Sequence, residues 1–209
     1  MDNVREKILD VSRGLFLAQG YKKTTTRQIL AEAGIKNGTL YHFFKNKEQI
    51  FMNLAAGIFE DASRVVEDLA GKDQSFVLQY AIGLNLEFFA VEKHERLAEL
   101  FYEAYKSWTV LEFLTQQGAQ KNKLLFEAYN PDFTDQDYYV RTMAIKSCIY
   151  GFIADRYHKG RISYLEKTAT ILELSLSLFN APKTDIKKAL KKSNDIIKKK
   201  KIVIFGFEI

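Results

Sequence analysis

The residues whose types and spacing suit recognition chemistry lie between Thr24 and Phe51, in the segment TTTRQILAEAGIKNGTLYHFFKNKEQIF. Two short helical patterns are joined there by a turn that contains Gly34, and the second pattern places polar and aromatic side chains on one face. Two helices joined in this way form a helix-turn-helix, whose second helix can enter the major groove of DNA. The chemistry that this segment favours is therefore hydrogen bonding to phosphates and base edges.

The first helix of this segment has a clear start and end in the sequence. Thr25 is a favourable N-cap, and Gln28 three residues later completes a capping box. Ile29 and Ala33 follow at helical spacing and are expected to face a core. Gly34 accepts the left-handed backbone that ends a helix, so the turn is predicted there.

The second helix is expected over residues 37–43, with Leu40 and Phe44 pointing inward. The side chains left facing outward are hydrogen-bonding groups: Lys36, Asn37, Thr39, Tyr41 and His42. Lysine and hydroxyl groups suit phosphates. Asparagine, threonine and histidine suit base edges. This face is therefore predicted to contact DNA.

Three further residues support this prediction. Gly38 carries no side chain, which would let the backbone approach DNA closely, and Lys45 and Lys47 at the start of the next helix are expected to contact phosphates. The alternative is an ordinary surface helix with one hydrophobic side. The coincidence of cap, turn glycine, polar face and flanking lysines favours DNA binding.

The sequence pattern predicts helices in the rest of the chain, and these helices would position the motif. Residues 4–19 and 47–70 are amphipathic at helical spacing, and the second of these begins beside the motif and ends far beyond it. Further helices are expected at 75–93, 95–106, 108–128, 136–158 and 163–180. Only two prolines occur, and no strand pattern of convincing length precedes residue 201. The sequence predicts an all-α fold.

The pieces FLAQGY, TTTRQIL, AEAG, GTLYHFF and KNKEQIF together resemble the DNA-binding domain of the TetR family of bacterial transcriptional regulators. The resemblance covers about the first quarter of the chain. It implies an N-terminal three-helix helix-turn-helix domain, a helical ligand-binding and dimerisation domain, and a homodimer. By position it also implies phosphate contacts from Thr25, Tyr41 and Lys47, and base-edge contacts from Arg27, Asn37, Thr39 and His42.

Charge is distributed unevenly along the chain. Residues 1–53 carry nine basic and five acidic side chains, for a net charge of +4. Residues 54–181 carry thirteen and eighteen, for −5, and residues 182–209 carry nine and three, for +6. A basic head on an acidic body suits a protein that presents one end to a polyanion, although a solvated surface can also be uneven by chance.

One region of the predicted body is crowded with aromatic residues: Phe88, Phe89, Phe101, Tyr102, Tyr105, Trp108, Phe113, Phe126 and Tyr129. An aromatic-lined cavity would hold an apolar or flat cationic small molecule, with tyrosine hydroxyls and Glu99 or Glu103 as polar contacts. The alternative is that most of these rings fill the core. Since the family resemblance implies a ligand site, a small-molecule effector of apolar or aromatic character is expected.

The last two body helices are candidates for a dimer interface. The first carries a stripe that contains small residues: Met143, Ser147, Tyr150, Gly151 and Ala154. The second carries an apolar stripe: Leu172, Leu176 and Phe179. The family resemblance implies that such helices pair with those of a second subunit in a four-helix bundle, and ordinary intrachain packing is the alternative. Cys148, the single cysteine, is expected to be buried there and inert.

The tail goes beyond the usual body of the family. Residues 183–201 form a basic amphipathic pattern, and residues 202–209 are mostly apolar. The favoured interpretation is a terminal helix whose apolar end packs on the core, with membrane contact or added DNA affinity as alternatives. The expected domains are thus 1–47 for DNA binding, 48–181 for ligand binding and dimerisation, and 182–209 as a basic extension.

Other function classes receive little support. His42, His94 and His158 are isolated, no metal-ligand spacing joins them to Cys148, and no catalytic or nucleotide-binding motif occurs. No cofactor, metal or enzyme activity is expected, and no apolar run approaches the ~20 residues of a membrane span. The N-terminus carries no secretory pattern, which favours the cytoplasm.

The sequence therefore predicts a ligand-responsive regulator. The family resemblance implies that it is a repressor. It would bind a palindromic double-stranded operator as a homodimer, and a ligand in the body would move helix 47–70 to change the spacing of the heads. The principal alternative is an architectural or protein-partner-regulated DNA-binding protein without a small-molecule pocket. An enzyme in a helical fold is a more distant rival, because no catalytic constellation supports it.

Overall fold

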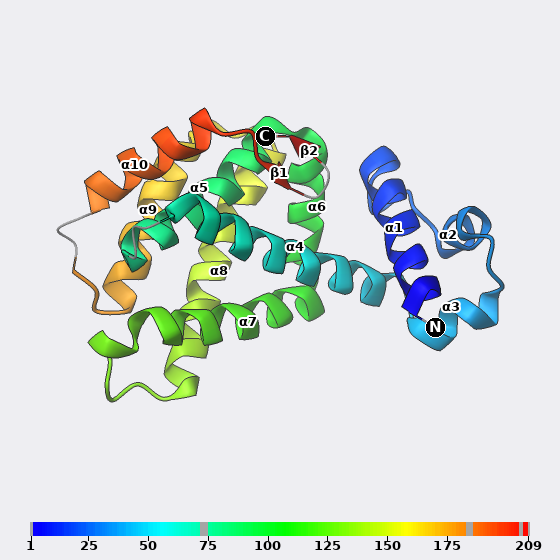
Figure 1. Ribbon diagram of the computed structural model, residues 1–209, viewed down its shortest axis with the longest axis horizontal. Helices are drawn as coiled ribbons and strands as arrows, with labels where there is room; N and C mark the ends of the chain where they lie inside the picture. Colours follow the sequence, from blue (N-terminus) through cyan, green and yellow to red (C-terminus); the bar gives the residue numbers. More distant parts are fainter. Residues whose placement is uncertain (1, 72–74, 183–185, 205–206, 209) are drawn as a thin grey trace.

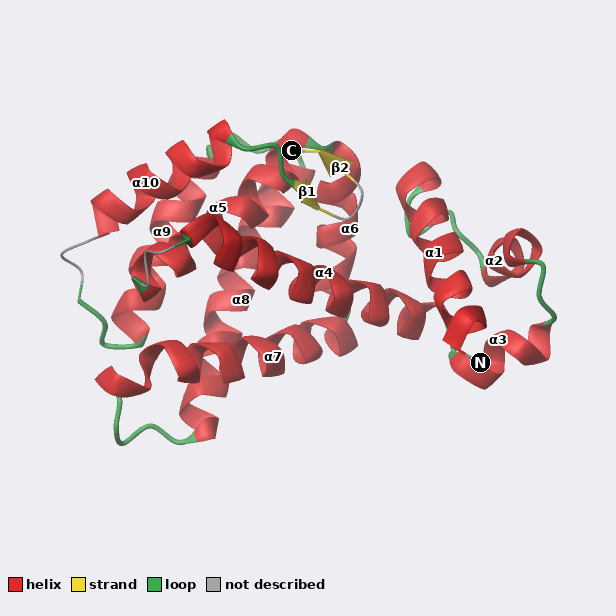
Figure 2. Ribbon diagram, in the orientation of Figure 1, coloured by secondary structure: helices red, strands yellow, loops and turns green. Residues whose placement is uncertain are grey.

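The computed structural model describes residues 2–71, 75–182, 186–204 and 207–208. Within these ranges the helices are α1 (Asp2–Gln19), α2 (Thr26–Ala33), α3 (Asn37–Phe43), α4 (Lys47–Ala70), α5 (Phe76–Lys93), α6 (Glu95–Lys106), α7 (Trp108–Phe126), the 3-10 helix η1 (Glu127–Tyr129), α8 (Asp135–Tyr157), α9 (Tyr164–Leu178) and α10 (Ile186–Lys199). The predicted break at 72–73, the first residues of the tail at 183–185, and residues 205, 206 and 209 of its apolar end lie outside the described ranges. The predicted all-α fold is confirmed (Figure 2).

The first three helices form a separate head at one end of the molecule (Figure 1). Its core contains fully buried apolar side chains from all three helices: Ile8 and Phe16 of α1, Ile29 of α2 and Leu40 of α3. These are the positions that recur at helical spacing in the sequence, so each helix buries the apolar face that its pattern predicts.

Helix α4 leaves the head and runs into the body (Figure 1). It starts where the Asn46 side chain accepts a hydrogen bond from Gln49 N at 2.8 Å, and it continues without a break to Gly71, whose φ of 60° ends it. In the body it packs against α5, which α9 and α10 also cover. Because so many neighbours surround α5, buried residues are spread around most of its circumference.

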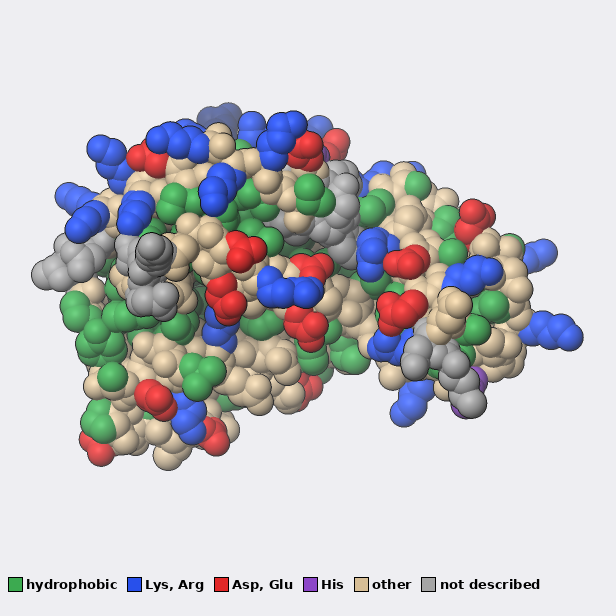
Figure 3. Space-filling view, in the orientation of Figure 1, with side chains coloured by type: hydrophobic (Ala, Val, Ile, Leu, Met, Phe, Trp, Pro, Cys, Tyr) green, Lys and Arg blue, Asp and Glu red, His purple; other side chains and the backbone are tan. Residues whose placement is uncertain are grey.

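The basic tail packs on the body. Helix α10 lies along α5 with its apolar side inward, so that Ile186, Ala189 and Ile197 are buried. Lysines remain on its outer face, and Figure 3 shows Lys and Arg side chains gathered along this helix. The expected terminal helix is present and packs on the core with its lysines outside. Of the apolar end that was expected to pack there, Ile202 is buried, whereas Val203 is 62% exposed.

The chain beyond α10 adds a small element that the helical prediction did not contain. Strands β1 (Val203–Ile204) and β2 (Phe207–Glu208) form an antiparallel hairpin, with Val203 opposite Glu208. His94 Nε2 lies 3.0 Å from the Glu208 carbonyl oxygen and ties the hairpin to the turn between α5 and α6. Across the described residues, no helix combines the length and the apolar character that a membrane crossing requires.

Helices α8 and α9 pack side by side, and Lys167 Nζ of α9 pairs with Asp155 Oδ2 of α8 at 2.8 Å. The apolar stripe assigned by sequence to a dimer interface faces the other way: Leu172, Leu176 and Phe179 are all 0% exposed within the protomer. That part of the interface prediction is wrong, because the most apolar side of α9 packs on its own core.

The stripe of α8 that was predicted to lie in the dimer interface is only partly exposed. Ser147 and Gly151 are exposed, whereas Met143, Tyr150 and Ala154 are half-buried. Cys148, which was expected to be buried, is exposed beside Ser147. Val140, about two turns before Ser147, is 52% exposed. The solvent-facing side of α8 is therefore a stripe of small and apolar residues, offset from the predicted one.

Candidate nucleic-acid interface and ligand cavity

The helix-turn-helix is built as its local signals predict. Thr25 and Gln28 form a complete capping box: Thr25 Oγ1 accepts from Gln28 N at 3.2 Å, and Gln28 Oε1 accepts from Thr25 N at 2.8 Å. Gly34 adopts the left-handed conformation with φ of 62° and ends α2. Helix α3 then begins at Asn37, with Lys36 as an N-cap that makes no side-chain hydrogen bond.

The outer face of α3 is free of the core and open to a partner. Tyr41 is 51% exposed on this face. The other predicted contact residues on or beside α3 that lie on the surface are Lys36, Asn37, Gly38, His42 and Lys45, while Thr39 is half-buried. On α2, Arg27 is exposed. The structure thus leaves most of these predicted donors and acceptors on the surface of the head.

Lys47 was predicted to contact a phosphate, but in the structure its side chain is bound within the head. Its Nζ donates to the carbonyl oxygens of Tyr21 and Thr24, both at 2.8 Å, and lies 4.1 Å from the centre of the Tyr21 ring. Burial lowers its pKa, and the charge of Glu103 opposes this shift. The ammonium group holds the loop between α1 and α2, so it is not free to extend toward a phosphate in this conformation.

Thr25→Ala is expected to lower the free energy of unfolding by about 1 kcal/mol, because alanine cannot accept the hydrogen bond from Gln28 N. The measurement is urea unfolding followed by circular dichroism, with Thr25→Ser as a control that retains the hydroxyl. Equal stabilities for the alanine and serine variants would show that the cap contributes nothing.

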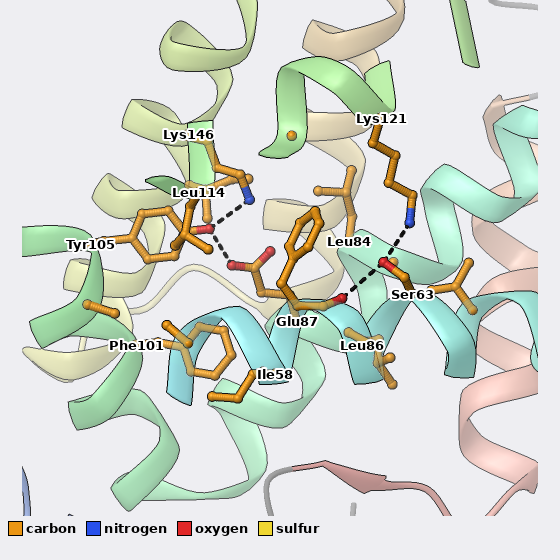
Figure 4. A pocket seen from close by; sticks show the side chains of 18 of the residues that line it. Ile58, Ser63, Leu84, Leu86, Glu87, Phe101, Tyr105, Leu114, Lys121 and Lys146 are labelled. Carbon is orange, nitrogen blue, oxygen red and sulfur yellow. Dashed lines mark hydrogen bonds between the residues drawn. The ribbon is translucent and has the colours of Figure 1, made fainter. Parts of the chain in front are cut away.

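A cavity of about 190 Å³ lies inside the body, among α4, α5, α6, α7 and α8. Its wall is mostly apolar, with Ile58, Leu84, Phe101 and Leu114 as examples from four of these helices (Figure 4). An engineered apolar cavity of ~150 Å³ in another protein holds benzene, so the volume here suits a molecule of about one ring.

Two polar groups of side chains interrupt the apolar wall (Figure 4). In one, Lys146 Nζ donates to the Tyr105 hydroxyl at 3.1 Å, and that hydroxyl donates to Glu87 Oε1 at 2.6 Å. In the other, Lys121 Nζ donates to Ser63 Oγ at 3.0 Å. Burial raises the pKa of Tyr105 well above its ordinary value, and Glu87 shifts it in the same direction, so Tyr105 is a neutral donor.

Only two of the nine aromatic residues named from the sequence line the cavity, namely Phe101 and Tyr105. The others are placed elsewhere: Phe88 packs on Phe152, Phe89 on Tyr164, Tyr102 on Tyr157, Phe126 on Phe179, Tyr129 on Phe76, Phe113 is half-buried, and Trp108 is 65% exposed. This corrects the predicted lining. A dense run of aromatic residues marks helices with large side chains, but helical geometry turns most of them away from any one point.

The polar residues predicted for the cavity also lie elsewhere. Glu99 pairs with Arg96, and Glu103 pairs with Lys22 of the head at 2.9 Å. Both carboxylates therefore face the head, and Glu87 is the acidic residue of the cavity wall.

Known proteins match both the head and the longer chain. A sequence model described as "Bacterial regulatory proteins, tetR family" matches residues 8–54. The HTH-type transcriptional regulator LmrA of Bacillus subtilis is 33% identical over 141 residues, which cover 57% of this chain and 75% of LmrA. The chain belongs to the TetR family of bacterial transcriptional regulators.

A second relative matches part of the chain, and a solved structure shares its fold. The uncharacterized HTH-type transcriptional regulator YerO of Bacillus subtilis is 33% identical over 97 residues, which cover 44% of this chain but only 34% of YerO. The crystal structure of RolR in complex with the ligand resorcinol has a TM-score of 0.63 at 17% identity, covering 92% of this chain and 93% of RolR, and shows the same fold. A TetR-family protein is a DNA-binding transcriptional regulator and not an enzyme.

In this TetR-family chain, α6 touches both the head and the cavity. Arg96 Nε donates to the Leu17 carbonyl oxygen at 3.1 Å, and Lys22 Nζ reaches Glu103 at 2.9 Å. On its other side, α6 contributes Phe101 and Tyr105 to the cavity wall. The contacts to the head and the wall of the cavity are therefore parts of one rigid helix.

The cavity residues that sequence reasoning missed do leave a signal. Lys121 follows Leu114 and Gly118 at helical spacing, and Lys146 lies between Thr142 and Ile149 in the same way. Each lysine thus occupies the inward register of an otherwise apolar or small stripe. A basic residue at such a register indicates a polar group aimed at an interior site.

Proposed function

We propose that this TetR-family protein is a repressor that binds a roughly palindromic operator as a homodimer and is released when a small molecule occupies the cavity. The position of α6 is the observation that carries the proposal, since this helix holds the head through Arg96 and Glu103 and lines the cavity through Phe101. A ligand shifts such an equilibrium only if it binds the DNA-incompatible state more tightly. Movement of α6 and α4 would then change the spacing of the two heads.

The DNA contacts are proposed for the exposed face of the head. Phosphate contacts are assigned to Thr25, Lys36, Tyr41 and Lys45, backbone approach to Gly38, and base-edge contacts to Arg27, Asn37, Thr39 and His42. Lys47 joins the phosphate contacts only if it leaves the carbonyl groups that it holds in this structure. In a dimer the two α3 helices would enter successive major grooves, ~34–36 Å apart.

The homodimer is proposed to form through the exposed side of α8 and the start of α9. Val140, Ile162 and Leu165 are 52%, 41% and 42% exposed, and Ser147 and Gly151 provide small residues for close approach. A patch of this kind would be covered by the same patch of a second copy, as a two-fold interface requires. Met143, Tyr150 and Ala154 are half-buried and would lie at its margin.

The division of the chain is proposed as DNA binding for 1–47, ligand binding and dimerisation for 48–181, and a basic extension for 182–209. A protein that acts on bacterial DNA works in the cytoplasm, which is the proposed location. The effector is proposed to be a small apolar or aromatic molecule, and the cavity volume of about 190 Å³ suits one ring. Resorcinol, the ligand in the RolR structure, is a molecule of this size. The presence of this cavity weighs against the alternative of a DNA-binding protein regulated only by a protein partner.

Lys22→Gln is expected to weaken the coupling between ligand and DNA, because it removes the ion pair between the head and Glu103. The coupling is the ratio of operator affinities without and with a one-ring compound that releases the operator, and it should fall about 2- to 5-fold. Fluorescence anisotropy with an operator selected from random duplexes measures both affinities.

Lys23→Gln is the matched control. Lys23 is exposed on the same loop, and among the described residues it forms no ion pair, so this variant loses the same positive charge near DNA but no contact with the body. Coupling that is unchanged in both variants would argue against transmission through this ion pair. Failure of every one-ring compound to release the operator would argue against the proposed function itself.

A further inference from the structure

We propose that the cavity ligand is an aromatic carboxylate of about one ring, whose carboxylate group lies between Lys121 and Lys146. This inference rests on the proposed function, because it names the chemical class of the effector. The two lysines enter the cavity wall from α7 and α8, and Glu87 enters it from α5. These are the charged residues of the described wall, so one net positive charge remains for a ligand to neutralise.

The glutamate is already engaged. Glu87 Oε1 accepts the Tyr105 hydroxyl proton at 2.6 Å, and Lys146 donates to the same hydroxyl oxygen at 3.1 Å. Lys146, Tyr105 and Glu87 therefore form a chain that runs from a cation to an anion. A carboxylate satisfied in this way has little need of a cationic ligand, which argues against the flat cation considered from the sequence.

Lys121 has no ion-pair partner of this kind among the described residues. It is half-buried, its Nζ donates only to the neutral Ser63 hydroxyl, and among the described residues no carboxylate lies within the 4.0 Å of an ion pair. Ser63 in turn donates to the Phe59 carbonyl oxygen at 3.0 Å. A cation held away from water without an acidic partner is costly, so an anionic ligand would stabilise it.

The surrounding charges favour the same conclusion. Burial lowers the pKa of Lys121, the negative charge of Glu67 on the surface of α4 raises it, and the positive charge of Lys146 has a smaller, lowering effect. Lys121 and Lys146 both line the cavity. An anion between them would stabilise the charged form of Lys121.

The rest of the cavity wall determines the size and the apolar character of the remainder of the ligand. Ile58, Leu84, Phe101 and Leu114 present hydrocarbon to the cavity, and no room is left for a large ring system in about 190 Å³. Benzoate combines one ring with one carboxylate and is therefore the probe of choice. Benzyl alcohol and benzylamine have nearly the same size but are neutral and cationic, respectively.

The test is isothermal titration calorimetry of the full-length protein, without DNA, with these three probes. Benzoate is expected to bind at least about 10-fold more tightly than benzyl alcohol, and benzylamine is expected to bind more weakly than benzyl alcohol. Lys121→Met is expected to remove the preference for benzoate. Lys123→Met is the matched control: Lys123 is exposed on the same helix, pairs with Asp135 at 2.7 Å and does not line the cavity, so the preference should be retained.

Tighter binding of benzylamine than of benzoate would overturn the proposal, and so would a preference for benzoate that survives Lys121→Met. If Lys121→Met does not fold, as judged by circular dichroism, Lys146→Met serves as the second variant and must reduce the same preference. Operator release is measured separately. Benzoate binding without operator release would support the inference and count against the proposed function. Operator release by benzyl alcohol or benzylamine, without benzoate binding, would overturn the inference and support the proposed function.

Discussion

Tyr41→Ala is expected to lower the affinity of the protein for its operator about 10- to 100-fold, with little change in thermal stability. Tyr41 is 51% exposed on α3, so its removal leaves no cavity in the head. In the proposed complex the ring and hydroxyl lie against the DNA backbone, where a lost contact weakens binding to all sequences. His42→Ala is expected to act more on sequence preference, because the neighbouring imidazole is proposed to reach base edges.

The measurement is fluorescence anisotropy with the selected operator and with a scrambled duplex, at one fixed salt concentration. Tyr41→Phe separates the hydroxyl from the ring. Leu124→Ala is a control far along the chain, since Leu124 is 76% exposed on α7 of the body and should affect neither binding nor folding. Unchanged operator affinity in both Tyr41→Ala and His42→Ala would remove α3 from the proposed interface.

The head was predictable because its signals are local. The capping box of Thr25 and Gln28 and the left-handed turn at Gly34 each depend on residues a few positions apart, and the structure contains both. Helix α3 spans Asn37–Phe43, as the sequence predicted, and α4 spans Lys47–Ala70. Caps and turns fix helix ends without reference to the rest of the fold, which is why these boundaries were recovered.

The placement of long side chains was not predictable in the same way. The sequence places Lys47 at the start of a helix, where a phosphate contact is reasonable, but the carbonyl groups of Tyr21 and Thr24 come near it only when the head folds. Glu103 likewise looks like a cavity residue by its neighbours, yet Lys22 draws it toward the head. Contacts between residues distant in sequence decide both cases.

The predictions of the cavity lining and of the dimer interface were wrong for a related reason. Residue type predicts that Leu172 and Leu176 pack against something, but only the arrangement of the helices decides whether that partner is the same chain or a second copy. In the cavity, the aromatic composition drew attention away from Lys121 and Lys146, whose inward register was the stronger indication of a site. The register of polar residues within apolar stripes is therefore more informative about a buried site than the density of rings.

Gly20→Ala is expected to destabilise the protein by about 1–3 kcal/mol and to loosen the contact between head and body. Gly20 ends α1 with a φ of 89°, a conformation that alanine adopts only with strain. A Cβ built there would overlap the Glu99 carboxylate and lie 2.8 Å from Arg96 Nη1. Those side chains can move, but Arg96 would then give up its hydrogen bond to the Leu17 carbonyl oxygen.

The expected results are a lower midpoint of thermal unfolding and a smaller effect of ligand on operator affinity, because Arg96 belongs to the helix that lines the cavity. Gly14→Ala is the matched control, since Gly14 is exposed within α1 and a Cβ there would have no atom within 4 Å. Alanine is the better helix former, so this variant should be neutral or up to about 1 kcal/mol more stable. Equal stability and equal ligand response in both variants would mean that the close approach of α6 to Gly20 plays no part in transmission. The coupling would then have to pass through the Lys22–Glu103 ion pair or through α4.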